Sequence, residues 1–352
     1  MNILLVKLSS LGDVIHTLPV VQDILAALPH AQIDWVVEPA FAPVLSLCPG
    51  VHRIVLCDLR GWRKAPLASH TRQAYRAFKA QLQATAYDAV IDLQGLTKSA
   101  LVARLARLAP GGKRYALANQ TDGSGYEAPT RWLADVAIRI EPHSHAVQRS
   151  RLLAAQALSY QAAEPANYGL KMPLPQHLHG LEAIENIAYS MPSKEQLVNS
   201  VAFIHGTSRA DKTWPLAHWV ALGQRLNAAG YSVVLAHGNA AELATSRAIA
   251  SALNAASPVP AALVLSTLAL DALAPVLSRC VGVIGVDSGV SHLAVALGLP
   301  HVQIYNFDTA WRTGPAQTGM QGARQVSVFA QPAPSVEAVW QAWLGCTAGL
   351  AP

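Results

Sequence analysis

An acidic residue follows the first apolar run of the chain, in the segment SSLGD at residues 9–13. Asp13 comes directly after Gly12, and a glycine there allows a tight turn and the close approach of a ligand. A carboxylate in such a loop can act as a general base toward an attacking hydroxyl. It can equally be a helix-start acid that the helix dipole favours, and the spacing leaves both interpretations open.

A second polar loop, HGTSRADKTWP at residues 205–215, also follows an apolar run. Thr207 and Ser208 offer hydroxyls, Lys212 offers a positive charge, and Pro215 is typical of a helix start. This combination can bind a diphosphate through charge, hydroxyls and turn amides. The alternative is an ordinary solvated loop.

The segment VGVIGVDSGVSHL at residues 281–293 has the pattern of a strand, a turn and a helix. Asp287 ends the strand, and Ser288 and Gly289 expose backbone amides where a helix begins and an anion is favoured. His292 follows about one turn into that helix. Capping residues and a core histidine are the alternative interpretation of these positions.

Two further features are candidates for ligand contacts. Glu242, in HGNAAE at residues 237–242, can accept hydrogen bonds from ribose hydroxyls, or it is a helix-start acid. A basic cluster that can grip phosphates or carboxylates surrounds Trp62 and is joined by a lysine after a later strand. Its members are Arg60, Arg63, Lys64 and Lys98. An ordinary solvated loop remains the alternative.

The elements that must position these loops are short apolar runs that alternate with helical patterns. The predicted strands cover residues 2–7, 33–38, 53–57, 89–93, 114–117, 201–206, 232–238, 261–266, 281–286 and 301–305. Helical patterns cover residues 72–83, 97–107 and 215–230, and a helix is expected from Asp13. Buried runs that alternate with helices predict an α/β fold with parallel sheets covered on both faces. Ligands of such sheets bind beyond the carboxyl ends of the strands.

The alternation of apolar runs and helical patterns is interrupted between about residue 160 and residue 197, where Pro165, Pro173, Pro175 and Pro192 occur. The later part of this stretch is interpreted as a linker. The sequence therefore predicts two doubly wound domains that face a cleft, over residues 1–180 and 198–330. The last helical pattern, at residues 335–345, is expected to cross back so that the segment 335–352 packs on the first domain.

Composition restricts the class of protein. The chain has 352 residues, 52% of them hydrophobic and 13% charged, which excludes a disordered chain and suffices for two cores. The net charge of +5 suits an anionic partner without identifying it. The four cysteines form no CxxC, no metal site is predicted, and His143 and His145 are interpreted as loop residues. No signal peptide or apolar run of about 18 residues is found, so a soluble, cytoplasmic protein is expected.

Four motifs together resemble glycosyltransferase family 9. They are KLSSLGDVIHTLP at the amino terminus, DLQGLTKSA at residues 92–100, DKTWP at 211–215 and VDSGVSHL at 286–293. The resemblance covers most of the chain. Within the family, SSLGDVIHTLP and RGWRK are more similar to the heptosyltransferase I branch than to the heptosyltransferase II branch.

The resemblance implies a GT-B fold with no cofactor and no metal ion, and an inverting transfer of heptose from ADP-heptose to the first Kdo of Kdo2-lipid A. It implies an enzyme peripheral to the cytoplasmic face of the inner membrane, with no nucleic acid partner. It also implies roles for the candidate residues: Asp13 as the base and Lys212 as the cation beside the departing diphosphate. The implied donor contacts are Thr207, Ser208, Glu242, Leu268, Asp287, Ser288, Gly289 and His292. The implied acceptor contacts are Arg60, Arg63, Lys64 and Lys98.

Two positions depart from the family pattern. Residues 119–128 contain no arginine where relatives tend to have a basic residue, and Ala210 stands where a second acid is common. Three rivals remain. They are a family member with another acceptor or ADP-sugar, a non-catalytic nucleotide-sugar or lipopolysaccharide binder, and a nicotinamide-dependent oxidoreductase. The missing G-x-G-x-x-G after the first strand counts against the oxidoreductase.

Overall fold

The computed structural model describes residues 1–172, 197, 199–257, 261–315 and 324–349. The chain divides into two compact units, Met1–Lys171 and Met172–Pro352. The expected end of the first domain, residue 180, lies outside the described residues.

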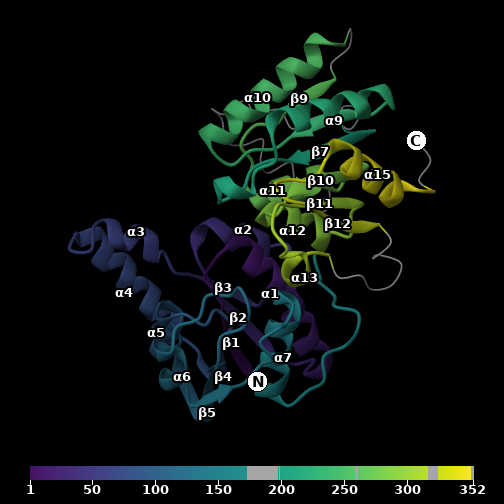
Figure 1. Ribbon diagram of the computed structural model, residues 1–352. Helices are drawn as coiled ribbons and strands as arrows, with labels where there is room; N and C mark the ends of the chain where they lie inside the picture. Colours follow the sequence, from purple (N-terminus) through teal and green to yellow (C-terminus); the bar gives the residue numbers. More distant parts are fainter. Residues whose placement is uncertain (173–196, 198, 258–260, 316–323, 350–352) are drawn as a thin grey trace. The chain divides into compact units, whose positions relative to one another are not determined.

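The first unit is built on a six-stranded parallel sheet with the order β3-β2-β1-β4-β5-β6 (Figure 1). Its strands are β1 (Asn2–Val6), β2 (Gln32–Val37), β3 (Arg53–Leu56), β4 (Ala86–Asp92), β5 (Arg107–Leu117) and β6 (Val136–Ile138). Its helices are α1 (Leu11–Ala27), the short 3-10 turn η1 (Pro39–Phe41), α2 (Ala42–Leu45), α3 (Leu59–Lys64), α4 (Ser69–Gln83), α5 (Thr97–Leu105), α6 (Pro129–Leu133) and α7 (Ala146–Leu158).

The second unit repeats this plan with the order β12-β11-β10-β7-β8-β9, again parallel throughout. Its strands are β7 (Ser200–Ile204), β8 (Ser232–Leu235), β9 (Ala262–Val264), β10 (Gly282–Val286), β11 (His301–Tyr305) and β12 (Gln325–Phe329). Its helices are η3 (Ala210–Lys212), α9 (Leu216–Ala228), α10 (Ala240–Ala255), α11 (Leu270–Leu277), α12 (Gly289–Ala296), α13 (Ala310–Thr313) and α15 (Val336–Thr347).

Both sheets therefore have the doubly wound strand order 3-2-1-4-5-6 when the strands of each unit are counted from its first. This confirms the predicted α/β class. In each unit the chain direction across the sheet reverses between the first and fourth strands, β1 and β4 or β7 and β10. The crevice beyond the carboxyl ends of those two strands is where such sheets bind ligands. The loops singled out in the sequence follow β1, β7 and β10.

The sheets are held by apolar side chains on both faces. In the first unit, Phe78 and Leu82 of α4 and Val102 of α5 pack with strand residues such as Val6 and Val90 in one core. Helices α1 and α7 contact each other closely away from that core (Figure 1). Burial on both faces explains why the central strands are continuous apolar runs rather than alternating ones. The strands β6 and β12, of three and five residues, were not predicted.

The last helix corrects an expectation. Instead of packing back on the first domain, α15 buries Val339, Trp343 and Cys346 in the core of the second unit. A Cβ on Gly282 of β10 would lie 2.9 Å from the Trp343 ring, so glycine there leaves room for the indole. The three side chains recur at helical spacing and form one apolar stripe, which the neighbouring sheet covers.

Among the described helices, none is both long and apolar enough to cross a membrane. All four cysteines are buried and unpaired with one another, as expected for reduced thiols.

Candidate active site

Asp13 is the third residue of α1, because the helix begins at Leu11 rather than at Asp13 as predicted. The backbone amide and the hydroxyl of Ser10 both donate to Asp13 Oδ2, at 3.1 Å and 2.9 Å. The bond from the Ser10 amide is part of a capping box, which starts the helix two residues earlier than predicted. The Asp13 side chain keeps 37% of its surface exposed, so the capping role and access to a ligand coexist.

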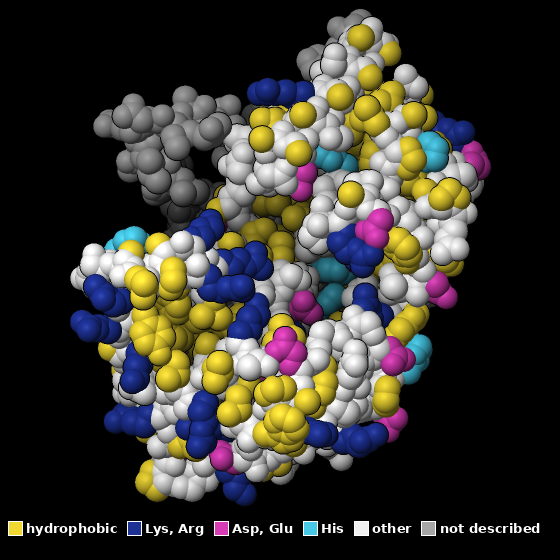
Figure 2. Space-filling view, turned by 60° about the vertical axis from the view of Figure 1, so that its left-hand side comes forward, with side chains coloured by type: hydrophobic (Ala, Val, Ile, Leu, Met, Phe, Trp, Pro, Cys, Tyr) yellow, Lys and Arg dark blue, Asp and Glu magenta, His cyan; other side chains and the backbone are white. Residues whose placement is uncertain are grey.

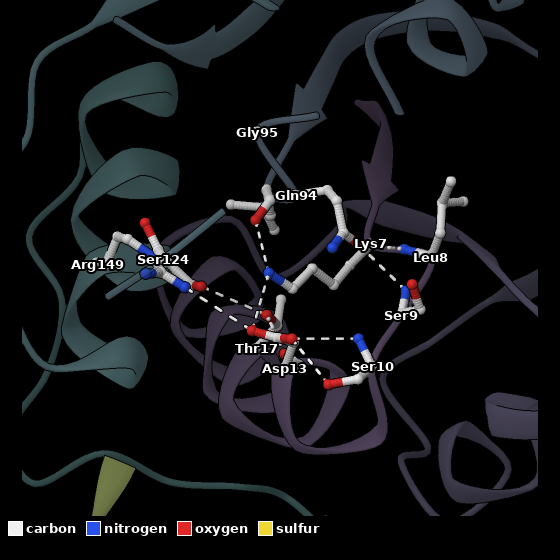
Figure 3. A network of polar contacts seen from close by, with 12 residues as sticks. Lys7, Leu8, Ser9, Ser10, Asp13, Thr17, Gln94, Gly95, Ser124 and Arg149 are labelled. Carbon is white, nitrogen blue, oxygen red and sulfur yellow. Dashed lines mark hydrogen bonds and ion pairs between the residues drawn. The ribbon is translucent and has the colours of Figure 1, made fainter. Parts of the chain in front are cut away.

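Two cations flank the same carboxylate (Figure 3). Lys7 Nζ lies 3.8 Å and Arg149 Nη2 lies 3.9 Å from Asp13 Oδ1. Lys7 is buried at the end of β1 and donates to the Leu93 carbonyl at 2.8 Å. Arg149, on α7, is buried and donates to Thr121 Oγ1 at 3.1 Å. Both cations are thus anchored independently of Asp13.

The cations shift the proton affinity of the site. Burial alone would raise the pKa of Asp13, but Lys7, the Ser10 amide and Arg149 outweigh it and hold that pKa below its usual value. Burial lowers the pKa of Lys7 to about 8, against the opposing effect of the Asp13 charge. Asp13 is therefore ionised and oriented near neutral pH.

The loops after β1 and β4 are tied together beside Asp13. The amides of Leu8 and Ser9 both donate to Gln94 Oε1, at 3.0 Å and 3.1 Å. Lys98 Nζ donates to Ser9 Oγ at 3.2 Å. The first-unit site therefore occupies the switch point of its sheet.

The predicted basic cluster is only partly brought together. Arg60 Nε lies 2.7 Å and Lys98 Nζ 3.6 Å from the carboxylate of Glu38, which is buried. Arg63 and Lys64 instead lie exposed in the last turn of α3. The structure thus places Lys98 and Arg60 around one acid and leaves the other two cations in solvent.

In the second unit, the loops after β7 and β10 meet through an ion pair. Lys212 donates to Asp287 Oδ2, and His292 Nε2 lies 3.4 Å from Asp287 Oδ1. Thr207 Oγ1 donates to the Asp287 carbonyl at 3.2 Å. Burial opposes ionisation of Asp287, but His292 and Lys212 prevail and lower its pKa to about 2.

The start of α12 lies at the same place. Ser288 caps this helix by accepting the Ser291 amide at 3.4 Å, and Gly289 is its first residue. Ser208 lies exposed in the loop that carries Thr207 and Lys212. Helix amides, hydroxyls and one lysine are hence available to an anion at the second switch point.

The loops after β8 and β9 extend this site. Glu242 Oε2 accepts the Gly238 amide at 2.7 Å, and a Cβ on Gly206 would lie 2.4 Å from Glu242 Cδ. Gly206 therefore allows Glu242 to come close to the end of β7. Thr267 Oγ1 lies 3.1 Å from His237 Nε2, which brings the segment with the half-buried Leu268 to the β8 loop.

Sequence reasoning missed Lys7, Glu38, Arg149 and Asn306. Asn306 donates to the carbonyls of Asp211 and Thr213, at 3.2 Å and 2.8 Å, and fixes the Lys212 loop. A lysine that ends a buried strand was a usable signal for Lys7. Arg149 and Asn306 belong to none of the motifs, and only their packing reveals them.

Within the described ranges, no group of three or more His, Cys, Asp or Glu side chains is placed to hold a metal ion.

The chain belongs to glycosyltransferase family 9, the heptosyltransferases, whose family model matches residues 75–339. It is 37% identical over 334 residues to lipopolysaccharide heptosyltransferase 1 of Pseudomonas aeruginosa, covering 93% of this chain and 83% of the relative. It is 33% identical to lipopolysaccharide heptosyltransferase 1 of Escherichia coli K12, covering 92% of this chain and 90% of the relative. The solved structure of E. coli heptosyltransferase WaaC with ADP superposes with a TM-score of 0.80 at 31% identity, over 97% of this chain and 98% of that one.

Proposed function

We propose that the protein transfers L-glycero-D-manno-heptose from ADP-heptose to the first Kdo of Kdo2-lipid A, in synthesis of the lipopolysaccharide inner core. The observation that carries the proposal is the similarity to heptosyltransferase 1 proteins over 93% and 92% of this chain, together with a WaaC structure of the same fold that holds ADP-2-deoxy-2-fluoro heptose. The enzyme would act peripherally at the cytoplasmic face of the inner membrane, with no nucleic acid partner.

We propose that the first unit provides the base. Asp13 takes the proton of a Kdo hydroxyl as the oxygen attacks the anomeric carbon of the heptose. Lys7 and Arg149 keep the carboxylate ionised and oriented, and its exposed fraction leaves an oxygen accessible to the acceptor. The basic residues Arg60, Arg63, Lys64 and Lys98 would hold the anionic acceptor.

We propose that the second unit holds the donor. The diphosphate would lie against Lys212, Thr207, Ser208 and the first amides of α12, with Asp287 and His292 beside the heptose and its phosphate. Glu242 would accept ribose hydroxyls, and Leu268 would contact the adenine. Bond formation on one face of the anomeric carbon and departure of ADP from the other inverts its configuration. Lys212 and the helix amides would stabilise the charge that develops on ADP, without a metal ion.

The test is release of ADP from ADP-heptose with and without Kdo2-lipid A, with product mass measured in parallel. Acceptor-dependent release that persists in excess chelator, with an inverted anomeric centre by NMR, is the expected result. ADP release at the same rate with and without the acceptor, or no release at all, contradicts the proposed reaction.

Another acceptor or ADP-sugar within the family is the second candidate, because lipopolysaccharide heptosyltransferase 2 of E. coli K12 is 26% identical over 87% of this chain. A panel of ADP-sugars and core acceptors separates the two candidates. A purely binding role would show ADP-heptose binding without turnover in either assay.

A further inference from the structure

One face of the first unit exposes large apolar side chains. Leu67, between α3 and α4, is 84% exposed, and Trp132 of α6 is 68% exposed. They are the most exposed large hydrophobic side chains in the ranges that the structure describes. Leu101 of α5 and Tyr75 of α4 are also exposed, at 53% and 40%. These side chains come from four elements that follow one another in the fold, since α3 contacts α4, α4 contacts α5 and α5 contacts α6.

The α3–α4 segment on this face carries charge of one sign. Residues 59–83, which form α3 and α4, contain six of the 26 Lys and Arg of the chain and none of its 21 Asp and Glu. Arg72, Arg76 and Lys79 follow one another at helical spacing on α4 and all are exposed. The buried residues of this helix, Thr71, Phe78 and Leu82, form a different stripe. The three cations are therefore free of a structural role in the core.

The neighbouring helices extend this surface. Trp62 of α3 packs edge-on against Tyr75 of α4, with ring centroids 5.8 Å apart. Helices α5 and α6 contact each other, and the Arg131 guanidinium lies 5.5 Å from the Trp132 ring centroid. Arg104 of α5 is exposed, and its Nη1 lies 4.0 Å from Oδ1 of Asp135, an acid between α6 and β6. Figure 2 shows hydrophobic side chains surrounded by Lys and Arg over α3 and α4.

We propose that this face, formed by α3, α4, α5 and α6, docks on a bilayer that contains anionic phospholipids. Exposed Trp and Leu side chains among Arg and Lys are the composition that binds at a lipid headgroup layer. Anionic headgroups supply the negative charge that this segment lacks. A second copy of the chain fits poorly, because a symmetric contact would set these cations against themselves.

The proposal rests on the proposed membrane acceptor, whose contact residues Arg63 and Lys64 border the same face on α3. Docking would bring the bilayer to the side of the unit that the acceptor approaches. The test below needs neither donor nor acceptor, so its result does not depend on the transferase reaction.

Vesicle cosedimentation tests the surface directly. The full chain is mixed with vesicles of phosphatidylcholine alone or of phosphatidylcholine with phosphatidylglycerol. The first variant replaces Arg72, Arg76 and Lys79 by Gln, and the second combines Leu67→Ser with Trp132→Ser. The matched control replaces three exposed arginines of the second unit by Gln: Arg247, Arg279 and Arg324. Circular dichroism and thermal unfolding verify that each variant folds.

The unaltered chain should bind only the anionic vesicles, and added salt should release it. Each neutralised cation should weaken binding about fivefold, so the triple variant falls by about 100-fold while the control keeps its binding. The Leu67 and Trp132 variant should also bind more weakly. No binding to anionic vesicles, or equal losses in the triple variant and the control, overturns the proposal. A dimer in light scattering that the triple variant dissociates would assign the face to a second copy instead.

Discussion

Arg149 Nη2 lies 3.9 Å from Asp13 Oδ1, although α7 and α1 are far apart in the sequence. The two helices lie side by side, and one turn further along α1, Thr17 Oγ1 lies 3.3 Å from Ser150 Oγ of α7. Helix packing thus sets the distance between the cation and the carboxylate. The charge environment of Asp13 depends on tertiary structure as much as on the loop that carries it.

Replacing Asp13 by Asn should lower kcat by about 100- to 10,000-fold while ADP-heptose affinity changes little, since a general base acts on the chemical step. Steady-state kinetics and donor titration measure the two quantities. The variant keeps one amide oxygen that can accept the Ser10 bonds but loses their charge, which should cost no more than about 1 kcal/mol of stability. Asp122→Asn, an exposed acid of the same unit, is the control. An equal loss of donor affinity would assign Asp13 a structural role.

Arg149→Met should shift the acid limb of the kcat/KM profile to higher pH. Arg149 lowers the pKa of Asp13, so its removal raises that pKa and the proposed base, Asp13, protonates at a less acidic pH. The charge-conserving Arg149→Lys should restore part of the shift, and Arg139→Met, at an exposed site, should leave the limb in place. A fall in kcat with an unmoved acid limb would mean that Arg149 acts only through packing.

Lys212→Ala should weaken ADP binding by about 10- to 100-fold and lower turnover with it, since it would remove the proposed charge-assisted contact to the diphosphate. Calorimetric titration with ADP measures the first effect and product release the second. Lys113→Ala, an exposed lysine of the first unit, serves as control. Unchanged affinity and turnover would place the diphosphate elsewhere.

Asp287→Asn should lose stability at neutral pH by about 2 kcal/mol, with the deficit shrinking in acid. The folded-state pKa of Asp287 is about 2, below its ordinary value of 3.8. The ionised Asp287 carboxylate therefore contributes its full stabilisation above pH 3.8, and this contribution is lost as the pH falls through about 2. Urea unfolding midpoints across this window measure the difference. Asp271→Asn, in the first turn of α11, is the control for the loss of an acidic side chain. A stability deficit of Asp287→Asn that stays constant in acid would contradict an ionic origin of the stabilisation.

Raised salt should weaken binding of a water-soluble Kdo acceptor more than binding of ADP-heptose. Arg63 and Lys64 are exposed and screened by salt, whereas Lys212 and Asp287 are largely buried. Affinities measured across a salt series give the two slopes, and Arg63→Gln with Lys64→Gln should flatten the acceptor slope. Equal slopes for both ligands would remove these two residues from the acceptor site.

The alternation of apolar runs and helices predicted the α/β class correctly, because strands buried on both faces leave a strong sequence pattern. The loops with Asp13 and Asp287 could be found for the same reason, since each directly follows such a strand. The assignment of the last helix to the first domain was wrong. The apolar stripe of α15 indicates that one side of the helix is buried. It does not indicate which sheet buries it, because that depends on long-range packing.

The sequence by itself determined which loops follow the strands and which polar side chains lie in those loops, because these are local properties of the chain. The tertiary structure decided which loops lie together. It set β1 beside β4 and β7 beside β10, and so brought Gln94 to Leu8 and Asp287 to Lys212. It also brought Arg149 to Asp13, since strand order and helix packing follow from burial of surfaces far apart in the chain.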